Sequence, residues 1–313
     1  MYGEIKLYAG SACPELTQRI ADYIGVPISP WEIITFPNEN IFIRLSSSVR
    51  GQDVYLVQTH DRPVHDNIME MLIAIDCFKR DSAGRVTVVV PYMSYSQSDK
   101  KDQPRVPITA RLLADMIEIA GADRWITIDL HAGQIQGFYK IPGDALSAQH
   151  IISDYFAAKN LTATVVTTDL GFAKGGRNYA ATLNMPLAFV EKRRAGNDPD
   201  REALTLIGNV SDRDVLIVDD LVDTAGSVQQ AVEVVRENGA RDVYLTFTHA
   251  VLSSPAWERL SMLNLKEIVT TDTLPIAPEE RLPNMTILTV AELLGEVILR
   301  SHEGRSVGEL FNE

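Results

Sequence analysis

Short runs of aliphatic and β-branched residues alternate with longer amphipathic stretches along the whole sequence. The runs that predict strands are 54–57, 86–90, 125–128, 165–167, 215–218 and 244–247. Each run is almost continuously apolar, which is typical of parallel strands whose two faces are both covered by helices. The stretches with helical periodicity are 66–79, 108–119 and 228–238. Repetition of strand, helix and strand predicts an α/β fold, doubly wound, with mainly parallel sheets flanked by helices.

A degenerate repeat indicates two domains of one fold. Gly-Ala at 121 and 239 leads through a predicted strand to His-Ala at 131 and 249, so both matches share one offset along the chain. Upstream, 86–92 aligns with 215–221 at a somewhat larger offset. The difference between the two offsets falls in the polar segment 94–107, which predicts a longer loop in the first copy. Generic α/β patterning is the alternative explanation for so loose a repeat.

The length of the chain supports the same division. A chain of 313 residues exceeds the ~150 residues of a typical domain, so two domains are expected. We place the N-terminal domain at residues 1–145 and the C-terminal domain at 146–313, joined near residues 142–147. The final helix is expected to be able to pack back onto the first domain.

The acidic balance of the chain narrows the range of partners. A formal net charge of −13 disfavours nucleic acid, whereas small phosphates need only a few amides and cations. Cys13 and Cys77 lie far apart and lack metal-ligand spacing, so reduced thiols are expected. No basic-then-apolar leader and no apolar run near the ~20 residues of a membrane span occur in the sequence. A cytoplasmic protein is therefore expected.

The most informative stretch follows the predicted strand at 215–218. Two acids end the strand, and a tight turn with two hydroxyls and two small residues leads into the next predicted helix. Ligands of open α/β sheets gather at the carboxyl ends of strands, and backbone N–H groups at a helix start favour a phosphate. The acids suit the hydroxyls of a sugar whose 5-phosphate lies in the turn. The predicted ribose 5-phosphate loop consists of Asp219, Asp220, Asp223, Thr224, Ala225, Gly226 and Ser227.

The alternative is a purely structural role for this stretch, as an ordinary strand–turn–helix in which Asp and Ser cap the helix. Paired acids ahead of Asp-Thr-Ala-Gly-Ser disfavour that alternative, and the arrangement resembles the ribose-phosphate loop of type I phosphoribosyltransferases. The G-x-x-x-x-G-K-[ST] motif of P-loop kinases is absent.

Further motifs cover essentially the whole chain in order. They include Ser-Val-Arg-Gly-Gln-Asp at 48–53, Asp-Lys-Lys-Asp-Gln-Pro-Arg at 99–105 and Asp-Leu-His-Ala-Gly-Gln-Ile-Gln-Gly-Phe at 129–138. With the phosphate loop, these segments resemble the ribose-phosphate pyrophosphokinase family. The resemblance implies two tandem type I phosphoribosyltransferase-like domains. It also implies transfer of the β,γ-diphosphoryl group of ATP to the anomeric hydroxyl of ribose 5-phosphate, giving phosphoribosyl pyrophosphate and AMP.

The resemblance also implies a catalytic set. His131 and Asp169 match positions that help to hold Mg²⁺ in the family, and Lys192 and Arg194 match the cations that face the transferring group. Without the flanking motifs, His131 would be interpreted as a core histidine at the end of a strand, and Asp169 as an ordinary turn residue. The run Glu191-Lys-Arg-Arg-Ala-Gly would, in isolation, be a solvated turn.

Departures from the family pattern fall on the nucleotide side. Gln97-Ser98 stands where many members have Arg-Gln, which removes a permanent charge and bidentate donors. The adenine-reading stretch, which a neighbouring subunit contributes in the family, is Phe36-Pro-Asn-Glu-Asn here and lacks the usual glycine. The residues expected to contact ATP are Phe36, Asn38, Asn40, Gln97, Ser98, Asp99, Lys101 and His131.

Two alternative functions stay open at this point. One is a non-catalytic or altered-donor member of the family that binds nucleotide or sugar phosphate and regulates an active partner. The other is a phosphoribosyltransferase that consumes phosphoribosyl pyrophosphate, although it would not need the histidine motif of the first domain. The family resemblance implies a homo-oligomer, a hexamer or a dimer-based assembly, with active sites shared between subunits.

The resemblance implies one more site, an allosteric phosphate site. The matching positions are Ser48, Arg50, Ser82 and Ser306. Asp81 replaces the small residue that is common beside this site, and its charge would oppose a phosphate. Weak or absent inhibition by ADP is therefore expected.

Overall fold

The computed structural model describes residues 2–194 and 202–311, and only the backbone of residues 192–194, 202–203, 309 and 311. The chain divides into two compact units. The first contains residues 1–147, 273–275 and 289–313, and the second contains residues 148–272 and 276–288. The final helix, which lies in the expected domain 146–313 and was expected to be able to pack back onto the first domain, belongs to the first unit.

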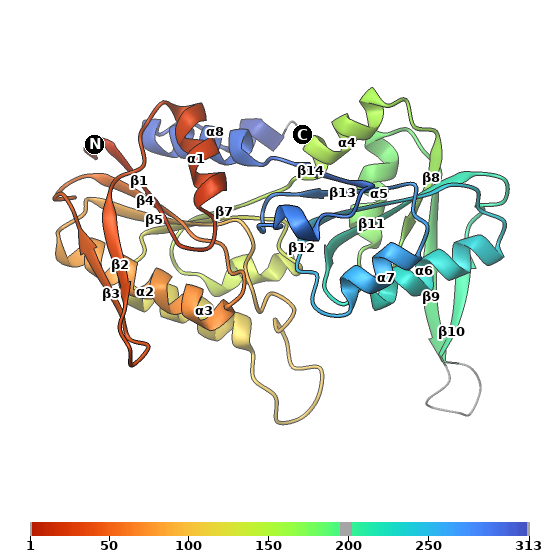
Figure 1. Cartoon of the computed structure of the whole chain (residues 1–313), viewed down its shortest axis with the longest axis horizontal. Coiled ribbons are helices and arrows are strands. Elements are labelled where there is room, and N and C mark those ends of the chain that lie inside the picture. The colour runs from red at the N-terminus through yellow and green to blue at the C-terminus, as the bar shows by residue number, and fades with distance from the viewer. Residues whose placement is uncertain (1, 195–201, 312–313) are drawn as a thin grey trace. The chain divides into compact units, whose positions relative to one another are not determined.

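The first unit has a five-stranded, fully parallel sheet of order β1-β4-β5-β6-β7. Its strands are β1 (Ile5–Ala9), β4 (Asp53–Val57), β5 (Arg85–Val90), β6 (Arg124–Ile128) and β7 (Gly143–Leu146). One face of the sheet is covered by α1 (Pro14–Ile24) and α8 (Ala291–Glu303), and the other by α2 (Val64–Arg80) and α3 (Thr109–Ala120) (Figure 1). Short 3₁₀ turns lie at Gly133–Phe138 and Gly308–Phe311.

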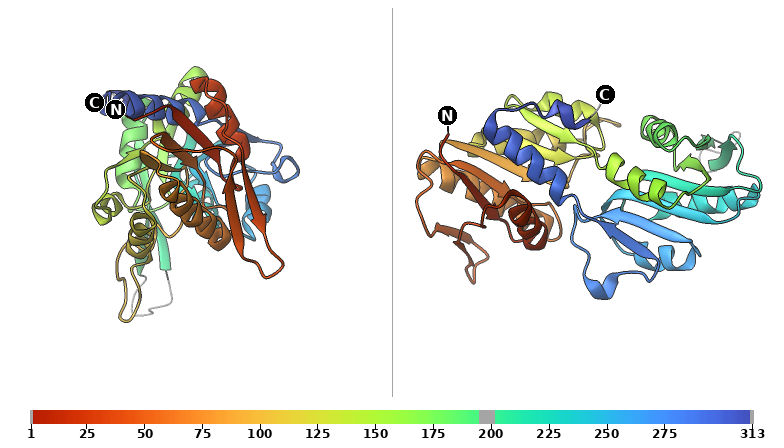
Figure 2. Two further views of the ribbon diagram at one scale, coloured as in Figure 1. Left: turned by 90° about the vertical axis from the view of Figure 1, so that its left-hand side faces the viewer. Right: turned by 90° about the horizontal axis from the view of Figure 1, so that it is seen from above.

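A separate antiparallel hairpin, β2 (Trp31–Thr35) and β3 (Ile41–Leu45), also belongs to the first unit. Figure 2 shows that this hairpin and the loop before α3 both extend away from the sheet of that unit. Neither strand of the hairpin was predicted from the sequence, because their short mixed patterns lack the continuous apolar character of the central strands.

The second unit has a seven-stranded sheet of order β10-β9-β8-β11-β12-β13-β14. Its strands are β8 (Ala163–Thr167), β9 (Leu187–Arg194), β10 (Glu202–Ile207), β11 (Asp214–Val222), β12 (Val243–Ala250), β13 (Glu267–Thr271) and β14 (Met285–Leu288). All neighbours are parallel except β9 and β10, which pair in antiparallel fashion. Its helices are α4 (Gln149–Ala158), α5 (Ala173–Thr182), α6 (Gly226–Glu237) and α7 (Ala256–Met262), with a 3₁₀ turn at Pro278–Glu280.

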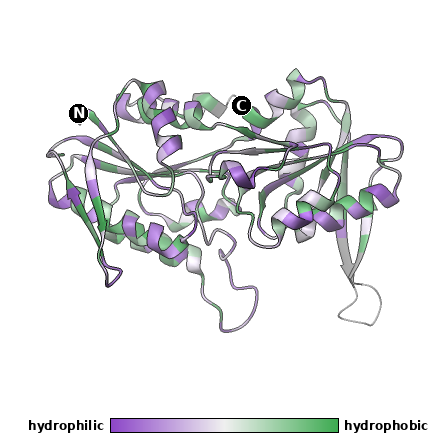
Figure 3. Cartoon of the chain, in the orientation of Figure 1, coloured by the Kyte–Doolittle hydropathy of each residue, from purple (hydrophilic) through white to green (hydrophobic). Residues whose placement is uncertain are grey.

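Each unit has its own hydrophobic core between its sheet and its helices. In the first, Val88 of β5 is fully buried with Phe78 of α2 and Ile117 of α3. In the second, Ile217 of β11 is fully buried with Val232 of α6. Figure 3 shows hydrophobic and hydrophilic residues alternating along α2 and α6, as expected for helices with one face on a sheet.

The predicted repeat corresponds to equivalent elements of the two units. β5 is followed by α3 and β6 in the first, and β11 is followed by α6 and β12 in the second. A glycine with positive φ follows each helix, Gly121 (112°) as the C-cap of α3 and Gly239 (84°) just after the C-cap of α6, and a Cβ in this conformation would be strained. The α/β class predicted from the sequence is confirmed. No helix within the described residues is long and apolar enough to cross a membrane.

Candidate active site

In the second unit, the carboxyl ends of β8, β11 and β12 meet at one edge of the sheet. The parallel register pairs Val218 with Thr167 on one side and Leu221 with His249 on the other. β11 continues through both predicted acids, Asp219 and Asp220, and ends only at Val222. The sequence had placed the acids just beyond the strand. In the structure they lie within it, so their backbones are fixed by the sheet.

The two acids have different environments. Asp219 accepts a hydrogen bond from the Thr168 hydroxyl at 2.6 Å and one from the backbone N–H of Asp220 at 3.0 Å. Asp220 is buried, and its Oδ1 accepts from the backbone N–H of Leu221 at 3.0 Å. Burial, and then the charge of Asp220, raises the pKa of the Asp219 carboxyl well above its ordinary value. Asp219 therefore holds a proton more readily than an exposed aspartate.

The turn after β11 brings the start of α6 to the same edge. Ala225 is buried and has a left-handed backbone (φ 59°), and the first helical bond runs from the N–H of Gln229 to the Ala225 carbonyl at 3.0 Å. The N–H groups of the first turn have no acceptor within a helix, so they are available to an anion. A Cβ on Gly226 would lie 3.4 Å from Nη1 of Arg259, so the backbone is closely approached there. Asp223, Thr224 and Ser227 lie in this turn and at the helix start.

Arg259 is a site residue that the sequence did not predict. Its Nη1, projecting from α7, donates to the Thr224 carbonyl at 2.8 Å and thereby fixes the phosphate loop. The guanidinium also places a cation beside the turn that is expected to hold a phosphate. Arg259 lies too far along the chain from Thr224 for any local pattern to link it to the loop.

Asp169 lies in the turn between β8 and α5, at the same sheet edge as Asp219. Its side chain is exposed, and its Oδ1 accepts from the backbone N–H of Phe172 at 3.1 Å. The Thr167 hydroxyl donates to the Asp169 carbonyl at 2.7 Å, which fixes the turn. One carboxylate oxygen, Oδ2, is left for a ligand.

In the first unit, the polar residues at 94–107 follow β5 and precede α3. Gln97, Lys100 and Lys101 carry polar or charged side chains toward the surface, whereas Asp99 is buried and accepts from the Gln134 side chain. Ser98 binds the start of α3, because its carbonyl accepts from the Ala110 N–H at 3.1 Å. The residues expected to contact ATP phosphates thus lie on one loop whose base is fixed.

A surface hollow of about 510 Å³ lies on this loop. It is lined by Tyr92, Tyr95, Ser96, Gln97, Ser98, Lys100, Asp102, Val106 and Pro107. His131 is also in the first unit, exposed after β6 and ahead of the 3₁₀ turn that carries Gln134. Because β6 neighbours β5 in the sheet, His131 and the loop follow adjacent parallel strands.

The predicted adenine-reading residues form the tip of the hairpin. The N–H of Phe36 donates to the Asn40 carbonyl at 2.9 Å, and the Asn40 N–H donates to the Asn38 side chain at 3.2 Å. Phe36 and Phe42 are each 45% exposed, with ring centroids 6.1 Å apart. Glu39 takes the left-handed conformation (φ 65°) at the position where glycine would be unstrained.

The segment around Ser48, where an anion site is predicted, contacts residues 81–83. Gly51 donates through its N–H to the Ser82 carbonyl at 2.8 Å, which brings this segment beside residues 81–83. Oδ2 of Asp81 accepts from the Ser48 hydroxyl at 3.0 Å and from the Val49 N–H at 2.6 Å. Arg50 is exposed there, and Ser306 follows α8, where its carbonyl accepts from Arg300 at 2.9 Å. The Asp81 carboxylate therefore occupies the Ser48 hydroxyl and the Val49 N–H, the donors that a bound anion would need.

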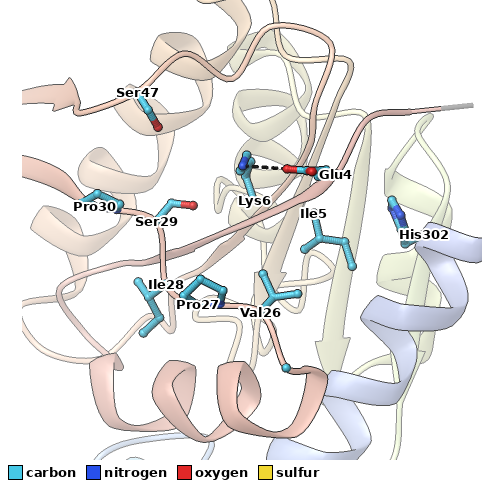
Figure 4. A pocket seen from close by; sticks show the side chains of 11 residues that line it. Glu4, Ile5, Lys6, Val26, Pro27, Ile28, Ser29, Pro30, Ser47 and His302 are labelled. Atoms are coloured by element: carbon cyan, nitrogen blue, oxygen red, sulfur yellow. Dashed lines mark hydrogen bonds and ion pairs between the residues drawn. The ribbon is translucent and has the colours of Figure 1, made fainter.

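A second hollow, of about 590 Å³, lies at the amino end of β1 in the first unit (Figure 4). Lys6 pairs with Glu4 at 3.2 Å, and Nδ1 of His302 lies 2.8 Å from the carboxylate of Asp53. Substrates of parallel sheets bind at the opposite, carboxyl edge, so this hollow is not part of the candidate site.

The predicted catalytic cations fall in β9. The backbone of Lys192 pairs with Leu204 of β10, and that of Arg194 pairs with Glu202. Their side chains lie outside the described part of the chain. Among the residues that the structure describes, no group of three or more His, Cys, Asp or Glu is placed to hold a metal ion.

Comparison with known proteins places the chain. A ribose-phosphate pyrophosphokinase from Caldanaerobacter subterraneus subsp. tengcongensis is 43% identical over 309 residues, 98% of each chain. A chloroplastic ribose-phosphate pyrophosphokinase 2 from Arabidopsis thaliana is 44% identical over 98% of this chain and 78% of its own length. The chain belongs to the ribose-phosphate pyrophosphokinase family. It is therefore an enzyme that transfers diphosphoryl groups, and nothing in the comparisons favours the regulatory alternative.

Family models and a solved structure agree with this assignment. The model of the N-terminal domain of ribose phosphate pyrophosphokinase matches residues 5–121, and that of the phosphoribosyl synthetase-associated domain matches 174–312. The crystal structure of phosphoribosylpyrophosphate synthetase from Mycobacterium smegmatis matches with a TM-score of 0.92 at 38% identity, covering 96% of this chain and 100% of that one. The prediction of two phosphoribosyltransferase-like domains is confirmed.

Proposed function

We propose that the chain transfers the β,γ-diphosphoryl group of ATP to the anomeric hydroxyl of ribose 5-phosphate, releasing AMP. Binding of ribose 5-phosphate is supported mainly by one observation: at the edge formed by β11 and α6, two aspartates lie beside the start of a helix. The first-turn N–H groups of α6, with Arg259 behind them, suit the 5-phosphate. Asp219 and Asp220, which cannot bind phosphate themselves, suit the ribose hydroxyls.

The nucleotide half of the proposal rests on the loop after β5. Gln97, Ser98 and Lys101 offer an amide, a hydroxyl and a cation to the ATP phosphates, and His131 follows the neighbouring strand. Phe36, Asn38 and Asn40, at the exposed tip of the hairpin, are proposed to read the adenine of a neighbouring subunit's ATP. An aromatic side chain 45% exposed beside Phe42 is suited to a contact outside its own unit. Because each active site would then need the hairpin of a neighbouring subunit, the enzyme is proposed to be a homo-oligomer.

Lys192 and Arg194 are proposed to face the transferring group. Phosphoryl-type transfer spreads negative charge over non-bridging oxygens, so catalysis depends mainly on positioning and on cations. The two positions alternate with Arg193 along an extended strand and therefore lie on the same face of it.

Mg²⁺ is the proposed metal, held in part by His131 and Asp169. Mg²⁺ keeps several waters and is bound through one or two protein ligands plus substrate phosphates. The exposed side chain of Asp169, whose Oδ1 accepts from Phe172 while Oδ2 is left for a ligand, could supply one such carboxylate contact. When bound, the ion would neutralise charge on the diphosphoryl oxygens.

The activity is tested by incubating the protein with ribose 5-phosphate, ATP and Mg²⁺ and following AMP and phosphoribosyl pyrophosphate. Lys192→Ala should lower kcat about 10²-fold or more while changing the KM of each substrate little, because its cation acts on charge that develops in the transition state. Near-normal turnover of this variant would make Lys192 a surface charge. Absence of AMP release by the wild-type protein would contradict the donor assignment.

Regulation by ADP at the Ser48 site is proposed to be weak. The Asp81 carboxylate binds the Ser48 hydroxyl and the Val49 N–H, so an anion would have to displace it against its charge. We expect ADP to inhibit only by competing with ATP, and Arg50→Ala to leave that inhibition unchanged. Strong, non-competitive inhibition that disappears in Arg50→Ala would contradict the proposal.

A further inference from the structure

The segment that follows β4 holds the start of the nucleotide loop. The Thr59 hydroxyl donates to the Thr273 carbonyl at 2.7 Å and accepts from the Tyr92 N–H at 3.1 Å. The N–H of His60 donates to the Tyr92 carbonyl at 3.1 Å. Tyr92 thus has both backbone polar groups bound by two consecutive residues at the end of the neighbouring strand.

His60 adds a side-chain contact to the first residue of the loop. Its Nδ1 lies 3.1 Å from the Ser94 hydroxyl and 3.3 Å from the Ser94 amide nitrogen. Because an amide N–H can only donate, Nδ1 must be the unprotonated nitrogen, and the proton of the neutral ring is on Nε2. Among the described residues, Nε2 has no hydrogen-bond partner.

The surroundings of His60 keep it in this acceptor form. The side chain is 1% exposed, and burial lowers its pKa to about 3. Protonation of Nδ1 would turn the acceptor into a donor and oppose the Ser94 N–H. A neutral imidazole is therefore maintained over the whole range in which such an enzyme works, at the cost of a buried N–H that is left without a partner among the described residues.

A second histidine holds the next part of the loop. Nε2 of His65, in the first turn of α2, lies 2.7 Å from the Tyr95 hydroxyl, and the two rings stack with an interplanar angle of 18°. Tyr95 has a left-handed backbone (φ 62°), which is unfavourable for an aromatic residue and persists only when its surroundings fix it. Its carbonyl accepts from the Ser98 N–H at 2.8 Å, and Tyr95 lines the 510 Å³ hollow.

We propose that His60 is a positioning residue for ATP binding, acting through Ser94, with His65 supporting the same loop through Tyr95. The inference rests on the assignment of residues 94–107 to the nucleotide. His60 does not touch the substrate in this proposal. It fixes the direction in which the loop leaves β5, and so the positions of Gln97 and Ser98.

The test compares His60→Leu with His60→Asn in the full-length enzyme. Leucine fills the buried site without an acceptor, whereas the Oδ1 of asparagine takes the position of Nδ1. We expect His60→Leu to raise the KM for ATP about tenfold and to leave the KM for ribose 5-phosphate within about twofold, because two neutral hydrogen bonds are lost on one side only. His60→Asn should recover most of the loss. An unchanged KM for ATP in His60→Leu would overturn the proposal.

A direct measure of the loop separates positioning from general destabilisation. Trypsin can cleave at Lys100, Lys101 and Arg105, and the fragments that end there are identified by mass. Cleavage at these sites should be several-fold faster in His60→Leu and close to wild type in His60→Asn. Val86→Ala, at the opposite end of β5, is the matched control: it should lower the Tm without changing loop cleavage or the KM for ATP. If Val86→Ala matched His60→Leu in both readouts, His60 would be merely structural.

Two further variants keep the outcome decisive. Should His60→Leu fail to fold, Ser94→Ala removes one of the same hydrogen bonds and should raise the KM for ATP about twofold to threefold; no change would overturn the proposal. Lys101→Ala tests the underlying assignment. If it leaves the KM for ATP unchanged, the loop does not bind nucleotide. If it raises that KM and His60→Leu does not, only the role of His60 is wrong.

Discussion

The segment between β5 and α3 and the segment between β11 and α6 occupy equivalent places in the two units, yet they are built differently. The first runs from 91 to 108, and the second only from 223 to 225. So short a turn leaves ligand binding to the backbone N–H groups of the helix and to the strand end. The long segment can place side chains over a ligand, but it needs contacts of its own to hold it.

The carboxyl ends of β5 and β11 also differ between the two units. The repeat that aligns 86–92 with 215–221 places Asp219 and Asp220 opposite Val90 and Pro91, and both residues of the first unit are buried. Carboxylates on a strand end suit a ligand with hydrogen-bond donors, such as sugar hydroxyls, whereas the apolar pair of the first unit leaves polar contacts to the loop.

The largest expected effect tests whether the short turn binds through its backbone. Gly226→Val places a branched side chain at the start of α6, within 3.4 Å of Arg259, where a phosphate must meet the N–H groups. We expect ribose 5-phosphate affinity to fall about 10²-fold, since charge-assisted hydrogen bonds of about 1.5–3 kcal/mol each are lost, while ATP affinity changes little. Binding is measured calorimetrically for each substrate. Glu233→Ala, at an exposed position farther along α6, is the control, and an unaffected Gly226→Val would show that the phosphate binds elsewhere.

An intermediate effect tests whether the long loop binds through its side chains. Gln97→Arg restores a guanidinium at a position that lines the hollow. A charge-assisted contact exceeds a neutral one by about 1–1.5 kcal/mol, so ATP affinity should rise up to roughly tenfold. Nucleotide affinity and AMP release are measured with ATP, GTP and ADP in parallel. The idea of a weakened donor site is wrong if wild type binds ATP with ordinary affinity and Gln97→Arg impairs it.

The smallest effect concerns the acid pair that only the second unit has. Because the pKa of Asp219 is raised in the folded protein, the folded state binds this proton more tightly than the unfolded state does. Stability is therefore lost as pH rises through the folded-state pKa, and Asp219→Asn should recover it. An effect of about 1 kcal/mol raises Tm by about 2–4 °C.

The pH profile of Tm decides this prediction. The gain in Asp219→Asn should be present at neutral pH and vanish below the ordinary carboxyl pKa of 3.8, where Asp219 is protonated in both the folded and the unfolded state. Asp154→Asn, an exposed acid on α4, should show no such profile. A Tm for Asp219→Asn that falls at neutral pH would mean that the charge of Asp219 stabilises the fold. The same variant should weaken ribose 5-phosphate binding, which a purely structural role would not do.

The sequence predicted most of what depends on continuous local patterns. The central strands β4, β5, β6, β8, β11 and β12 were predicted because burial on both faces leaves an unbroken apolar run. The helices α2, α3 and α6 followed from their periodicity, with ends within a few residues of those observed. The strand, turn and helix that carry the predicted phosphate loop were also anticipated, because these three elements are consecutive in the sequence.

Only the tertiary structure decided which distant residues support these local elements. Arg259 reaches Thr224, Thr168 reaches Asp219 and His60 reaches Ser94 because parallel neighbours in a sheet bring their carboxyl ends together whatever their separation in the sequence. The same holds for α8, which packs beside α1 and whose Ser301 carbonyl accepts from Arg85 of β5 at 3.0 Å. A hydrophobic pattern specifies that a surface is buried, not which partner buries it. The sequence alone thus determined the fold class and the strand–turn–helix of the predicted phosphate loop, and the packing of strands and helices determined how that loop and the predicted nucleotide loop are held.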